Sequence, residues 1–148
     1  MHKLDEIDKE ILNILSSNSR ISIKKLAEII HLSSPAVSNR IERLEDEGFI
    51  LGYSTIVDYE KLDRPIVAFI QLTLEPESKT AFIDYISSVN DVLECYHVAG
   101  PYSMLIKACF SLPSKLNEFV GALQKYGKTE TQIVFSCIVP QRNPKLNY

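Results

Sequence analysis

The sequence lacks any apolar run long enough to cross a membrane, and no apolar core of a secretion signal stands near its start. Its longer apolar runs are short, such as residues 66–70, whereas a membrane-spanning helix needs about 20 apolar residues. Cysteine is scarce as well: the three cysteines have no C-x-x-C spacing and cannot pair completely. Together these absences predict a cytoplasmic protein.

Histidine, a frequent catalytic base, occurs three times, as His2, His31 and His97. The sequence shows no nucleophile–base spacing and no glycine-rich phosphate loop. We therefore expect no catalytic residues and no required cofactor. His31 is interpreted as a turn residue in the left-handed conformation, which histidine tolerates better than most side chains.

A metal site is not expected either. In the hairpin described below, Cys95 and His97 share one face, whereas Cys109 points to the other and Cys137 lies on a separate strand. Zinc usually takes four close ligands, which this arrangement does not offer. The thiols are interpreted as small apolar core groups.

The remaining composition is that of a folded protein, with 148 residues, 45% of them hydrophobic and 24% charged, and a net charge of −3. This length suits one domain or two small ones. Residues 20–43 hold five basic and two acidic side chains, a local charge of +3 inside an acidic first half. The basic stripe, and not the net charge, therefore bears on the partners of the chain.

Three helices are predicted in the first half. Asp5 is a candidate N-cap of a helix that ends near Ser17, and Ser22 can cap a second, short helix. Ser34, followed by proline, favours the start of a third helix, which Gly48 ends. Residues 49–57 are then expected to form a short hairpin. The side chains expected to be buried on the second and third helices are Ile23, Leu26, Ile29 and Ile30, and Val37, Ile41 and Leu44.

The second and third helices, joined by a three-residue turn, form a helix-turn-helix pattern, whose second helix enters the DNA major groove. Arginine pairs with guanine, asparagine pairs with adenine, and small residues allow close approach to the bases. Lys24 and Lys25 are expected to contact phosphate, and the hairpin would be a wing along the backbone. The residues of the third helix expected to face DNA are Ser34, Ala36, Ser38, Asn39, Arg40 and Arg43.

The second half predicts strands and helices in the order β-α-β-β-α-β. Strands are expected at residues 66–74, 92–99, 102–110 and 133–139, and helices at 82–89 and after Pro113. The chain is therefore assigned to the α+β class, with a winged helix-turn-helix followed by a ferredoxin-like sandwich. The expected division is a DNA-binding domain at 1–58, a linker at 59–64, an effector-sensing and oligomerisation domain at 65–140 and a loose tail at 141–148.

A tight turn at Gly100-Pro101 would pair residue 99 with residue 102 and place Glu94 opposite Lys107. One face of this hairpin then lies under the two helices, and the other face needs a cover because it is largely apolar. We expect a second copy of the chain to cover it. The residues assigned to this dimer interface are Val67, Phe69, Tyr96, Val98 and Leu105.

Residues in both halves resemble a known family. Arg20-Ile21-Ser22, Leu32-Ser33, Arg40-Ile41, Arg43-Leu44-Glu45 and Gly48-Phe49-Ile50 are similar to the winged helix-turn-helix of the Lrp/AsnC (feast/famine) transcription regulators, and residues 94–107 resemble their central hairpin. The resemblance implies double-stranded DNA as a partner, homodimers that often assemble into octamers, and an amino-acid-type effector.

The effector would lie near the hairpin tip and the polar run at residues 128–132, where hydroxyls, an amide and backbone groups could hold the ends of an amino acid. Many relatives carry acidic residues in the hairpin, where this chain has Pro101 and Ser103. The residues assigned to effector binding are Gly100, Pro101, Tyr102, Ser103, Thr129, Glu130, Thr131 and Gln132.

Three other functions are alternatives to a regulated transcription factor. The fold of the second half also serves enzymes, but no catalytic constellation accompanies it. A helix-turn-helix can dock on protein, which would make the chain an interaction adaptor. An architectural DNA-binding protein without an effector is the third alternative.

Overall fold

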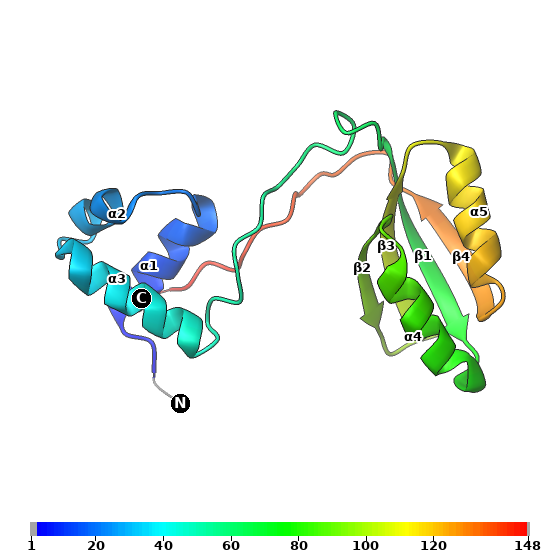
Figure 1. Ribbon diagram of the computed structural model, residues 1–148, viewed down its shortest axis with the longest axis horizontal. Coiled ribbons are helices and arrows are strands. Elements are labelled where there is room, and N and C mark those ends of the chain that lie inside the picture. The colour runs from blue at the N-terminus through cyan, green and yellow to red at the C-terminus, as the bar shows by residue number, and fades with distance from the viewer. Residues whose placement is uncertain (1–2, 148) are drawn as a thin grey trace. The chain divides into compact units, whose positions relative to one another are not determined.

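The computed structural model describes residues 3–147, which divide into two compact units. The first unit combines Met1–Ile56 with Val139–Tyr148, and the second is Val57–Ile138. The expected linker at 59–64 is thus part of the second unit, and the expected tail belongs to the first (Figure 1). In the described part of the chain, no helix has the length and apolar character needed to cross a membrane.

The first unit contains α1 (Glu6–Ser17), α2 (Ile23–Ile29) and α3 (Ser34–Asp46). Asp5 caps α1 as predicted, through a capping box in which the Asp5 and Asp8 side chains each accept a bond from the other's backbone N–H. The helices surround a core that includes Ile11, Leu26 and Leu44, all of them fully buried.

The N-cap of α3 lies one residue earlier than predicted. Ser33, not Ser34, is the N-cap of α3, because its hydroxyl accepts the Ala36 N–H. His31 has a φ of 55° and takes the left-handed conformation expected of it. Ile29 was wrongly expected to be buried: it is 42% exposed, and Ala27 fills the core position beside Leu26.

The predicted hairpin at residues 49–57 is wrong, since this segment contains no strand. Gly48, with a φ of 75°, ends α3, and the Phe49 and Ile50 N–H groups both donate to the Leu44 carbonyl at 2.9 and 3.0 Å. These bonds hold the start of the segment against the helix end. The rest of the segment, residues 51–57, is too short to form two strands that would be stable on their own.

The second unit contains the seven elements β1 (Ile66–Leu74), η1 (Pro76–Ser78), α4 (Lys79–Ser88), β2 (Val92–His97), β3 (Met104–Phe110), α5 (Pro113–Leu123) and β4 (Gly127–Ile133). The antiparallel sheet has the order β2-β3-β1-β4, and α4 and α5 cover the same face of it (Figure 1). This arrangement is the predicted ferredoxin-like sandwich. Its core is built on Ile70, Ile106 and Phe110 from the sheet and on Phe82 and Leu123 from the helices.

The last strand lies six residues earlier than predicted. β4 contains the polar run at residues 128–132, and it pairs with β1 from Leu74↔Gly127 to Ala68↔Ile133. An edge strand can be polar because its outer side faces solvent. Of the predicted strand at 133–139, only Ile133 belongs to β4; residues 134–139 lie outside the sheet, and Phe135 is fully exposed.

The register of the β2–β3 hairpin is confirmed from Glu94↔Lys107 to His97↔Met104. The strands themselves stop at His97 and Met104, so residues 98–103 form a longer loop than the predicted two-residue turn. A bulge between Val92 and Glu94 pairs Val92 with Ala108 and not with Cys109, as the simple register implied.

The C-terminal tail, expected to be loose, docks on α1. The Asn13 side chain donates to the Leu146 carbonyl and accepts the Leu146 N–H, both at 2.9 Å. The Lys9 ammonium donates to the Asn147 carbonyl at 3.0 Å. The first unit therefore consists of two segments that are far apart in the sequence.

Glycine is required at one position of the sheet. A Cβ on Gly127, whose φ is 156°, would lie 2.0 Å from the Thr73 carbonyl oxygen on β1. We expect Gly127→Ala to lower the free energy of unfolding by about 2 kcal/mol or more, measured by urea denaturation. Gly121→Ala is the matched control, because the exposed α5 position has free space and should gain roughly 1 kcal/mol. Equal effects of the two substitutions would contradict the strained role of Gly127.

Candidate nucleic-acid interface and ligand site

The outer surface of α3 carries the short polar side chains predicted to face DNA. Asn39 is exposed, and Ser34, Ala36 and Ser38 are partly exposed along the first half of the helix. Ser33 and Pro35 are exposed, so the N-terminal end of α3, which Ser33 caps, is open to approach. On α2, Lys24 and Lys25 are both exposed, and Lys25 pairs with Glu28 at 3.2 Å.

The structure contradicts the predicted outward placement of Arg40 and Arg43. The Arg40 Nη1 lies 2.6 Å from the Asp5 Oδ2 and 2.7 Å from the Asp8 Oδ1. The Arg43 Nη2 lies 2.7 Å from both Asp8 oxygens. Both arginines therefore bind α1, and the four side chains form a charge-balanced cluster that we call the arginine clamp.

Asp8 is at the centre of the arginine clamp and is fully buried. Its two oxygens accept bonds from Arg40, Arg43 and the Asp5 N–H, so that the buried charge is well compensated. The hydrogen bond to Asp5 raises the pKa of the Arg40 guanidinium. Burial acts to raise the pKa of Asp5, but the bonds from Arg40 and from the Asp8 N–H hold it below its ordinary value.

A signal for the clamp was present in the sequence. Asp8 stands three residues before Ile11 and four after Leu4, inside the apolar stripe of α1, where a carboxylate has to be paired. At 100° per residue, Arg40 lies about 70° from the centre of the buried stripe of α3, whereas Asn39 lies about 170° from it. Arg40 therefore flanks the core, and Asn39 faces away from it.

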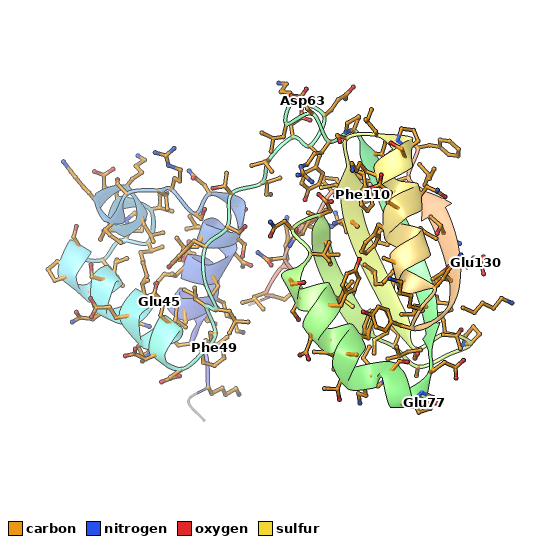
Figure 2. All side chains as sticks on the ribbon, turned by 45° about the vertical axis from the view of Figure 1, so that its right-hand side comes forward. Glu45, Phe49, Asp63, Glu77, Phe110 and Glu130 are labelled. Carbon is orange, nitrogen blue, oxygen red and sulfur yellow. The ribbon has the colours of Figure 1, made fainter. Side chains whose placement is uncertain are left out.

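A shallow hollow lies on the face of the sheet that carries no helix. Its lining comes from β1, from the β2–β3 loop and from β4, where Figure 2 labels Glu130. Among the described residues, Lys128 and Glu130 form no ion pair, so one cation and one anion flank the hollow. The lining residues are Gln71, Thr73, Pro101, Tyr102, Lys128, Thr129 and Glu130.

The hollow brings together half of the predicted effector residues. Pro101, Tyr102, Thr129 and Glu130 line it, whereas Gly100, Ser103, Thr131 and Gln132 do not. Two of these absences have a visible cause. The Ser103 hydroxyl accepts the Leu74 N–H at 2.9 Å and so holds the loop in place. Thr131 pairs with Ile70, whose side chain lies in the core on the other face of the sheet.

Three lining residues were missed by the sequence reasoning. Gln71 and Thr73 alternate with the buried Ile70 and Leu72 on β1, so that the strand period alone places them on the open face. Lys128 belongs to the polar run already singled out.

The remainder of the open sheet face is apolar around one ion pair. The pairings Val67↔Cys109, Phe69↔Lys107 and Tyr96↔Leu105 place four of the five predicted interface residues on it, next to the 3.0 Å pair between Lys107 and Glu94. The fifth, Val98, follows the end of β2. Hydrogen bonds from Tyr96 and Lys107 lower the pKa of Glu94 against the opposing effect of its burial.

The cysteines follow the predicted role in one case. Cys109 is buried, but Cys95 and Cys137 are exposed and are not core groups. Residues 3–147 contain no group of three or more histidine, cysteine or acidic side chains arranged to hold a metal ion.

A helix-turn-helix with an open N-terminal end of its second helix, joined to a sheet domain with a polar hollow, defines a ligand-responsive DNA-binding transcription regulator. Two family models match these units: a winged helix-turn-helix DNA-binding model at residues 4–50 and the Lrp/AsnC ligand binding domain at residues 67–144. The chain belongs to the Lrp/AsnC family of transcription regulators.

Relatives of similar length support this assignment. The regulator LrpA of Bacillus subtilis is 36% identical over 88% of this chain and 97% of its own. The solved structure of Bacillus subtilis LrpC is 31% identical, with a TM-score of 0.89 over 95% of this chain and all of that one. A feast or famine regulatory protein of M. tuberculosis, solved in complex with L-methionine, is 25% identical, with a TM-score of 0.88 over 97% of this chain and all of that one.

Proposed function

We propose that the chain regulates transcription by binding alone, without catalysis, and that it acts in the cytoplasm on operator DNA. The first half of α3 reads base edges through Asn39, Ser38 and the small residues Ser34 and Ala36, while Lys24 and Lys25 contact phosphate. The observation that supports this proposal most is the open, Ser33-capped end of α3, with Asn39 directed away from the core.

The DNA proposal predicts different effects for base-reading and phosphate-binding residues. Asn39→Ala should weaken binding to the DNA upstream of its own gene at least about tenfold and reduce its preference over a scrambled duplex. Lys24→Ala should weaken binding to both duplexes alike. It should also make the slope of log K against log salt concentration shallower by about one unit. Fluorescence anisotropy over a salt series measures both effects, with Lys125→Ala in the second unit as the control.

Equal wild-type binding to both duplexes would instead favour an architectural DNA-binding protein. No binding to either duplex at low salt would favour an interaction adaptor. If Asn39→Ala binds the upstream duplex with the affinity of wild type, the proposed base contact is contradicted.

We propose that the open sheet face is covered by the same face of a second copy, giving a homodimer that can assemble further into an octamer. The apolar residues Val67, Phe69 and Leu105 surround the Glu94–Lys107 pair, and in the described chain no helix covers this face (Figure 1). Two such faces bury apolar surface and give the two recognition helices that a palindromic operator needs.

Phe69→Glu should convert the dimer to monomers at micromolar concentration, because dimerisation would bury two carboxylates in an apolar contact. Sedimentation velocity measures the change. Thr80→Glu, an exposed position on α4, adds the same charge on the helix-covered side and should leave the dimer intact. A wild-type monomer, or a dimeric Phe69→Glu variant, would contradict the proposed interface.

We propose that the effector is a zwitterionic amino acid with an uncharged side chain. The hollow supports this class because Lys128 can hold the carboxylate and Glu130 the ammonium, with Gln71, Thr73 and Tyr102 as further polar groups. The complex of the tuberculosis relative with L-methionine makes that amino acid the first to test.

L-Methionine should bind with a measurable heat in isothermal titration calorimetry, whereas methionine amide, which lacks the carboxylate, should bind at least about tenfold more weakly. Glu130→Gln should weaken L-methionine binding to a similar degree, because it removes the partner of the ammonium group. Glu77→Gln, on an exposed residue of η1, is the matched control. Equal affinity of Glu130→Gln and wild type would contradict this binding mode.

A further inference from the structure

Asp8 is the one charged residue in the described chain whose side chain is fully buried. It lies on α1, outside the helix-turn-helix pair itself, yet its carboxylate binds two arginines of the helix that faces DNA. The arginine clamp is therefore a contact between a core carboxylate and the recognition helix.

The clamp removes two positive charges from the electrostatic surface of α3. A free arginine binds phosphate on any sequence, and each phosphate contact strengthens specific and non-specific binding alike. Here Arg40 and Arg43 are balanced by Asp5 and Asp8 at 2.6–2.7 Å, and the side chains are only 24% and 34% exposed. The side chains left on the accessible first half of α3 are short and neutral, whereas Glu42, Glu45 and Asp46 on its second half are exposed and acidic.

We propose that Asp8 is a positioning residue for DNA specificity, which holds Arg40 and Arg43 on α1 and so withholds them from DNA phosphates. Discrimination between operator and other DNA then depends on the neutral residues around Asn39 and is not diluted by two sequence-independent contacts. The inference rests on the proposed reading of DNA by α3.

Asp8→Asn tests the inference in the full-length protein, because asparagine keeps the size of the side chain and removes its charge. The variant should bind a scrambled duplex about three- to tenfold more tightly at 0.1 M salt, with a salt slope steeper by about one to two units. The preference for the upstream duplex should fall accordingly. A purely structural role would weaken binding to both duplexes and would not steepen the slope.

Glu6→Gln is the matched control, since it removes one negative charge from the same first turn of α1 without releasing an arginine. It should change binding to the scrambled duplex less than twofold. If Glu6→Gln and Asp8→Asn have the same effect, only the net charge matters, and the proposal is overturned.

Arg40→Gln gives a second test if Asp8→Asn does not fold, because Asp8 then keeps its bonds to Arg43. Binding of Arg40→Gln to the upstream duplex should stay within about threefold of wild type, and a loss of binding would overturn the proposal. If wild type binds both duplexes equally, the proposed base reading by α3 is wrong, and an architectural DNA-binding protein is favoured. In that case the affinity of Asp8→Asn for the scrambled duplex still tests whether the clamp withholds the arginines from phosphate.

Discussion

The DNA-binding unit depends on a buried carboxylate held between two guanidinium groups. With about 56 residues before the second unit, its core is small and includes the fully buried Ile11, Leu26 and Leu44. The bonds from Asp8 to Arg40 and Arg43 are directional and tie these two helices at a defined register. Asp8 without both arginines would be an unpaired buried charge, at a cost of about 3–5 kcal/mol, so the clamp disfavours arrangements that separate the two helices.

The second unit is organised by the two unlike faces of its sheet. Ile70, Leu72 and Ile106 face α4 and α5 and form the core, whereas the alternate residues of the same strands form the open face. That face is apolar around Phe69 and polar toward Thr73, where the hollow lies. One strand period therefore serves packing on one side and, in our proposals, self-association and effector binding on the other.

The sequence predicts well wherever local chemistry decides the structure. The cap at Asp5, the left-handed His31, strand β1 and the Glu94–Lys107 register are all set by neighbouring residues or by a short turn. It fails where tertiary contacts decide. The polar strand β4 is stabilised by its pairing with β1, and the clamp joins residues 32 and 35 positions apart. The sequence predicts Arg40 and Arg43 as DNA ligands from residue type and position, but it does not show the aspartates that the structure pairs with them.

The two units are connected by the chain twice. Besides the segment that follows α3, the chain leaves β4, where Glu130 lines the hollow, and returns to α1, where Asn13 holds the backbone of Leu146 by two hydrogen bonds. An effector changes DNA binding only if it has different affinities for two states of the protein. Both chain connections are anchored on helices of the DNA-binding unit, one at the end of α3 and the other on α1.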